Sequence, residues 1–173
     1  SSGLLVMGLA LFYAWNLSAI YGEPIIPAPS VTDALRVSTI VSSACNTLSY
    51  IAIALIFWRL RRFARFAGAA AYIAGAALLA GYFLSFLPDF DTQIIRLTVT
   101  GIDRICAAWV IVAWGMRYAQ LDSLRITIYT LAAFLIAFAL CPLLIYGDPL
   151  IRALATAISL PVSMGLMHAS KNY

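Results

Sequence analysis

The stretch LRITIYTLAAFLIAFALCPLLIY, residues 124–146, decides the fold class of this chain. Its 23 residues include one charged side chain, Arg125, and the polar residues Gly147 and Asp148 follow it directly. At 1.5 Å per residue a helix of this length rises about 34 Å, which exceeds the roughly 30 Å of hydrocarbon in a bilayer. The stretch therefore predicts a transmembrane helix.

Five further apolar runs share the pattern, each bounded by charged residues, glycine or proline. Across the whole chain 64% of the residues are hydrophobic and only 10% are charged, whereas an ordinary soluble domain carries about 25% charged residues. Lipid allows the outside of a helical bundle to be as apolar as its inside. We therefore predict an all-α integral membrane protein with a six-transmembrane-helix bundle. The other five runs cover residues 3–21, 32–58, 66–87, 93–118 and 149–168.

Six spans of about 20 residues with short connections use nearly the whole length, so we expect residues 1–173 to form a single six-helix transmembrane domain. The chain has no initiator Met, opens almost inside a span and stops just after one. We interpret it as a fragment of a longer protein. A 3+3 inverted organisation, with opposite orientations of the two halves, stays open because the halves resemble each other only weakly.

The distribution of basic residues predicts the orientation. One side of the membrane collects seven of the eleven Lys and Arg residues, and the positive-inside rule places that side in the cytoplasm. An even number of spans then puts both termini in the cytoplasm of a cell that carries the protein in its plasma membrane. Trp58, Trp114, Tyr118, Tyr21 and Tyr146 fall near span ends, as interfacial anchors do. The cytoplasmic set is Arg59, Arg61, Arg62, Arg65, Arg117, Arg125 and Lys171; the outer set is Arg36, Arg96, Arg152, Glu23, Asp33, Asp89, Asp91 and Asp148.

Asp103 and Arg104 lie about ten residues inside the fourth run, near the middle of the bilayer. A charge at that depth costs about 2.5–3.5 kcal/mol on insertion scales, so it normally faces a partner or a water-filled cavity. Arg96 and Thr100 precede the pair at helical spacing and extend a polar stripe. We expect this stripe to bind a ligand or to gate the bundle, and the alternative is a structural ion network.

Asn46 lies at the same depth in the second run, within a stripe of serines, and Asn16 lies nearer the outer end of the first. A polar cavity between the first, second and fourth spans, open to the outside, is one interpretation. The other is that Asn46 and the serines join helices by hydrogen bonds, and for these residues we favour it.

No pattern in the sequence supports an enzyme, a metal site or a cofactor. Cys45, Cys106 and Cys141 lie inside apolar runs without metal-ligand spacing, and His168 is the single histidine. The net charge of +4 is spread over membrane loops, so we interpret it as a topology signal and expect no nucleic-acid contact by this chain itself.

Two segments carry a resemblance to a known family. They are Trp-Gly-Met-Arg-Tyr-Ala-Gln-Leu at 114–121 and Ile-Ser-Leu-Pro-Val-Ser at 158–163. They resemble the Trp-Gly-x-x-Tyr-Ala-x-Leu and Leu-Pro-x-x-Ser segments of actinobacterial transcriptional regulators. In that group a membrane region like half of a major-facilitator protein precedes a cytoplasmic LuxR-type helix-turn-helix. The likeness is specific over about 50 residues, from Ala113 to Ser163, and extends loosely to the six-span layout.

The resemblance implies a membrane sensor that binds a small molecule and controls DNA binding through an attached domain outside this chain. Asp103 and Arg104 are not in the matching segments, so their role rests on membrane physics. Besides the lipid bilayer and a small-molecule ligand, a second copy in a homodimer stays an open partner.

One alternative is half of a major-facilitator transporter. Residues 59–65 are basic but lack the glycine and the acid that such transporters carry between spans two and three, which disfavours it. A membrane scaffold without a ligand is the third class.

Overall fold

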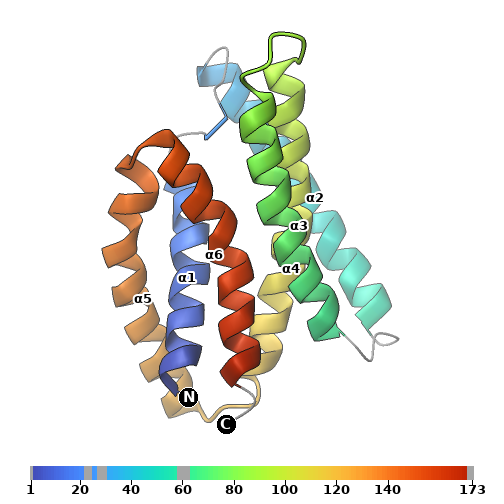
Figure 1. Ribbon diagram of the computed structural model, residues 1–173. Coiled ribbons are helices and arrows are strands. Elements are labelled where there is room, and N and C mark those ends of the chain that lie inside the picture. The colour runs from blue at the N-terminus through green and yellow to red at the C-terminus, as the bar shows by residue number, and fades with distance from the viewer. Residues whose placement is uncertain (1, 22–24, 27–30, 58–62, 171–173) are drawn as a thin grey trace. The chain divides into compact units, whose positions relative to one another are not determined.

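A computed structural model describes residues 2–21, 25–26, 31–57 and 63–170 (Figure 1). The described residues form six α-helices and no strand. The side chains of residues 19–21, 31–36, 56–57 and 63–65 lie outside the description, as do Glu23, Trp58–Arg62 and Lys171. Much of the orientation signal therefore falls outside it. The helices are α1 Ser2–Tyr21, α2 Val31–Phe57, α3 Phe63–Leu84, α4 Thr92–Tyr118, α5 Ser123–Tyr146 and α6 Pro149–Ala169.

Each helix begins and ends within three residues of a predicted apolar run. Five of the described helices are long and apolar enough to cross a membrane. In α1 the described side chains end at Ser18, so only its apolar segment Ser2–Ser18 is compared. The prediction of a multi-pass helical membrane protein is thus confirmed. The helix starts follow local chemistry: the Asp148 carboxylate accepts a hydrogen bond from the Leu150 amide at 2.9 Å, and Asp91 accepts one from the Gln93 amide at 2.8 Å.

The chain forms two compact units. Unit 1 consists of residues 1–23 and 112–173, and unit 2 consists of residues 24–111, so α4 belongs to unit 2 up to Ile111 and to unit 1 from Val112. In unit 1, α1 lies between α5 and α6 and packs against both (Figure 1). Ala14, Ala137 and Leu144 form a core there, and the ring of Tyr13 stacks on that of Phe134 with centroids 4.2 Å apart.

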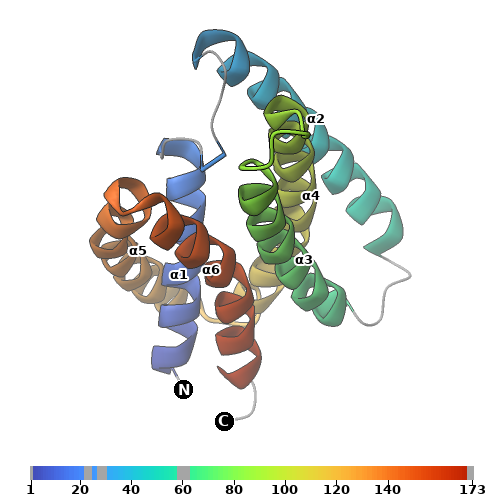
Figure 2. The same ribbon diagram turned by 45° about the horizontal axis from the view of Figure 1, so that its top comes forward.

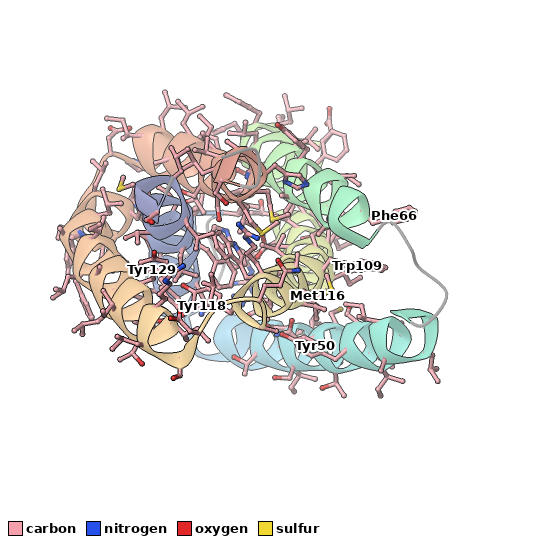
Figure 3. The ribbon with its side chains drawn as sticks, turned by 90° about the horizontal axis from the view of Figure 1, so that it is seen from below. Tyr50, Phe66, Trp109, Met116, Tyr118 and Tyr129 are labelled. Carbon is pink, nitrogen blue, oxygen red and sulfur yellow. The ribbon has the colours of Figure 1, made fainter. Side chains whose placement is uncertain are left out.

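In unit 2, α3 runs beside α4 in both views (Figures 1 and 2). A Cβ atom added to Gly81 of α3 would overlap Val99 of α4, so the missing side chain permits this approach. Near the other end of α3, the rings of Phe66 and Trp109 contact each other with centroids 6.3 Å apart (Figure 3).

Trp114 was expected at the membrane interface, but only 2% of its surface is exposed. Its indole is buried because α1 and α6 pack against it, as described below. By contrast Tyr146, at the end of α5, is 85% exposed, as an interfacial anchor requires.

Candidate functional site

The predicted charged stripe lies along α4 in unit 2. Asp103 is the twelfth residue of this 27-residue helix, so it lies close to the middle of the span. Asp103 and Arg104 are both half-buried, and these two adjacent side chains interact electrostatically. Arg96, two turns earlier, is buried. The helix therefore carries opposite charges at its centre and a buried cation nearer its start.

The polar residues of α2 reach the same part of α4. A Cβ added to Gly101 would lie 3.5 Å from the Cys45 sulfur, so the two helices are close where Cys45 and Gly101 meet. Tyr50, one turn beyond Asn46 on α2, interacts electrostatically with Arg104. Asn46 and Tyr50 are separated by four residues and so share a helix face. The structure thus brings Tyr50, Asp103 and Arg104 together, with Asn46 one turn away.

Asn46 differs from Ser49 of the same stripe. The Ser49 hydroxyl donates to the Cys45 carbonyl of its own helix at 2.6 Å, which satisfies it locally. The Oδ1 atom of Asn46 is buried and has no hydrogen-bond partner among the described residues. A buried acceptor without a donor is costly, which makes Asn46 a candidate for contact with a ligand.

On its other side, α4 packs against α3. Cys106 forms a hydrogen bond with the backbone of Ala74, and Asp103 lies close enough to Cys106 to act on it electrostatically. The polar group that consists of Asn46, Tyr50, Asp103 and Arg104 is named the α2–α4 polar cluster below. Its position in the middle of two apolar helices, together with its mixed charge, allows it to hold a small polar molecule by hydrogen bonds and ion pairing.

Asn16, the remaining predicted residue, lies on α1 in unit 1 and is half-buried. A cavity shared by α1, α2 and α4 stays a prediction. Two neighbours of Asn16 have packing roles: Tyr13 stacks on α5, and the Ser18 hydroxyl donates to the Trp15 carbonyl of its own helix at 2.7 Å.

Sequence reasoning missed a buried contact in unit 1. The hydroxyl of Ser163, which is fully buried on α6, donates to the Gly8 carbonyl of α1 at 2.7 Å and accepts from Nε1 of Trp114 on α4 at 3.2 Å. We call these three residues the three-helix contact. Trp114 and Ser163 belong to the two segments that carry the family resemblance, so the segments themselves pointed to this pair.

A second buried polar residue was also missed. Arg152 of α6 is 6% exposed, and its Nε atom donates to the Leu144 carbonyl near the end of α5 at 3.2 Å. A cation at the C-terminal end of a helix is favourable because the carbonyl groups there carry partial negative charge. This contact fastens the α5–α6 turn and gives Arg152 a structural role.

Within the described part of the chain, no three His, Cys, Asp or Glu residues come together as metal ligands. His168 Nδ1 lies 2.8 Å from the Met164 carbonyl of its own helix. Comparison of the chain with protein-family models, with curated proteins and with solved structures finds no match.

Proposed function

We propose that this chain is the membrane sensor region of a LuxR-type transcriptional regulator, with the α2–α4 polar cluster as its ligand site. The observation that carries the ligand site is the pair Asp103 and Arg104 in the middle of α4, next to Tyr50 of α2. Charges at that depth are expensive in lipid, so they are typical of binding sites and conduction paths.

The assignment to the regulator family rests on the two resembling segments. Trp114 and Ser163 are one hydrogen bond apart, although 49 residues separate them in the sequence. The motif residues therefore act together in one contact, which supports reading them as a single functional pattern. DNA binding would belong to a cytoplasmic domain outside this chain.

For the membrane topology we propose six spans, with α1 as the first and both termini in the cytoplasm. Helix α1 has 20 residues, which lies within the range of about 17–25 residues that cross a bilayer. Reporter fusions test this directly: six spans put a reporter at either terminus in the cytoplasm, whereas five spans put the two termini on opposite sides. Termini on opposite sides would refute the six-span layout.

Ligand binding is tested by thermal unfolding of the detergent-solubilised protein with a panel of small charged and zwitterionic molecules. A ligand that binds the folded state raises the unfolding temperature. We expect Asp103→Asn and Arg104→Gln each to abolish that rise while membrane insertion is unchanged. Arg125→Gln is the matched control, because Arg125 is exposed and pairs with Asp122 at 3.4 Å. A rise that both cluster variants retain would exclude this site.

The second candidate, half of a major-facilitator transporter, is favoured by one observation: Asp103 is a titratable group in the middle of a span, as proton-coupled transport needs. The coding sequence beyond Tyr173 separates the two. A helix-turn-helix there supports the sensor. Six further spans without a soluble effector domain would refute it in favour of the transporter half.

A further inference from the structure

Four buried polar side chains lie on one face of α6 in unit 1. They follow one another at spacings of four, three and four residues, which keeps them on the same side of a helix. None of them is more than 6% exposed. The face therefore places a cation and three hydroxyl groups away from solvent. The four residues are Arg152, Thr156, Ser159 and Ser163.

Thr156 differs from the buried serines of the described helices. Each of those serines donates its hydroxyl hydrogen at 2.6 or 2.7 Å: Ser163 donates to α1, and Ser18, Ser49, Ser159 and Ser170 donate to carbonyl groups three or four residues earlier. The Thr156 hydroxyl oxygen is also buried, yet it has no hydrogen-bond partner among the described residues. Because a buried hydroxyl without a partner is unfavourable, we expect Thr156 to contact a molecule that is not part of the chain.

A buried cation lies one helical turn before Thr156. Arg152 is 6% exposed, and its Nε atom donates to the Leu144 carbonyl at 3.2 Å. A guanidinium has five N–H groups in one plane, so it can serve several acceptors at once. Side chains four residues apart are neighbours on a helix surface, and a helical side chain leans towards the turn before it. Thr156 therefore lies where its hydroxyl can share an acceptor with Arg152.

The position of the two residues along α6 suits a negative charge. Arg152 is the fourth residue and Thr156 the eighth of this 21-residue helix, about 5 Å and 10 Å along its axis from Pro149. The first turns of a helix favour anions because their N–H groups carry partial positive charge. The carboxylate of Asp148, which precedes the helix, is exposed and accepts the Leu150 amide. An ion from the aqueous side could thus reach Arg152 without crossing the centre of a bilayer.

We propose that Arg152 and Thr156 form a binding site for a small monovalent anion, chloride or a carboxylate group, that is a structural component of unit 1. The guanidinium balances the charge of the anion, and the Thr156 hydroxyl donates a hydrogen bond to it. A small anion fits because both groups are buried and only one turn apart. The site goes beyond the proposed function and does not depend on it, since none of its residues belongs to the α2–α4 polar cluster.

The test is thermal unfolding of the whole detergent-solubilised chain while sodium chloride or sodium acetate replaces sodium gluconate. The ionic strength is held constant, so screening of surface charges does not change. An anion that binds the folded state raises the unfolding temperature as its concentration rises. We expect such a rise with chloride, with acetate or with both, but not with the bulkier gluconate. The response to acetate alone would identify the ligand as a carboxylate.

Thr156→Val is the decisive variant, because it keeps the shape of the side chain and removes only the hydroxyl. It should raise the anion concentration that gives half of the stabilisation about tenfold, as expected for the loss of one hydrogen bond to a charged group. Ser159→Ala is the matched control and should leave that concentration unchanged, because the Ser159 hydroxyl is equally buried but donates to the Ala155 carbonyl at 2.6 Å. Arg152→Gln should abolish the response. Thr156→Val keeps the test valid if loss of the Leu144 bond prevents that variant from folding.

Three results would overturn the anion site. The first is a wild-type unfolding temperature that responds to neither anion, which would favour a buried water at Thr156. The second is a Thr156→Val protein that responds like the wild type. The third is an equal weakening in Thr156→Val and Ser159→Ala, which would make the effect a general consequence of losing a hydroxyl from α6. Each result leaves the ligand screen at the α2–α4 polar cluster unaffected.

Discussion

The two units treat their polar side chains differently. In unit 1 two buried polar side chains form hydrogen bonds across helices: Ser163 bonds to α1 and α4, and Arg152 bonds to the end of α5. Ser18 and Ser159 bond within their own helices, and Thr156 Oγ1 has no hydrogen-bond partner among the described residues. In unit 2 the polar group at mid-helix is charged, and the Asn46 Oδ1 atom lacks a hydrogen-bond partner among the described residues. Polar side chains whose hydrogen bonds are made to other helices hold those helices together. Charged side chains and a hydrogen-bond acceptor without a donor can instead bind another molecule.

Under the proposed function, unit 1 is a scaffold and unit 2 holds the ligand site. Unit 1 should therefore lose stability when its close contacts are disturbed, regardless of any ligand. Unit 2 should tolerate replacements in its polar cluster that leave no unbalanced charge, and should lose binding instead. Four changes test this division.

The largest effect is expected from Gly8→Leu in unit 1. The added side chain has no room between Leu166, Ser163 and Trp114, so the helices must separate. We expect a loss of about 3 kcal/mol in the free energy of unfolding, measured in detergent. Gly3→Leu is the control, because nothing lies within 4 Å of a Cβ at Gly3. A Gly8→Leu protein as stable as the control would show that α1 is not held at this point.

The next effect concerns charge balance in unit 2. Asp103→Asn or Arg104→Gln alone leaves one charge without its neighbour's opposite charge, and each should cost about 2 kcal/mol. The double variant removes both charges and should be more stable than either single variant. Unfolding of all three proteins in the same detergent measures this. Additive losses in the double variant would mean that the two residues do not act as a pair.

A smaller effect of opposite sign is expected at Asn46. Replacement by leucine removes a buried acceptor that has no donor in the described structure and keeps a similar volume. We expect stability to be unchanged or raised by up to about 1 kcal/mol, while ligand-induced stabilisation is lost. A loss of stability above about 1 kcal/mol would reveal a structural hydrogen bond of Asn46 and would remove it from the binding region.

The sequence predicted the helices well because their limits are local. Charged residues, glycine and proline interrupt the apolar runs at nearly every helix end, as Gly147, Asp148 and Pro149 do between α5 and α6. Asp103 and Arg104 were also recognisable locally, because a charge inside an apolar run is conspicuous.

What the sequence could not supply depends on which helices pack together. Tyr50 reads as an ordinary aromatic residue until α2 is placed beside Arg104. Trp114 near a helix end looks like an interfacial anchor, but its burial and its bond to Ser163 follow from the packing of α1 and α6. Gly8 gives no signal either, because the need for a missing side chain arises from atoms more than 100 residues away in the chain.

The smallest effect is expected at Gly101, the unit 2 counterpart of Gly8. A Cβ there would meet the Cys45 sulfur at 3.5 Å and Val41 Cγ1 at 4.0 Å, which are ordinary contact distances. Gly101→Ala should therefore fit, and the higher helix propensity of alanine should raise stability by about 0.5 kcal/mol. Gly8→Ala, measured beside it, should instead lower stability, because three atoms lie within 3.2 Å of its new Cβ. Opposite signs would confirm that α1 and α6 are closely fitted in unit 1 while α2 and α4 leave space in unit 2. Equal losses would mean that the α2–α4 contact is as tight as the scaffold, and that the polar cluster has no room for a ligand without helix movement.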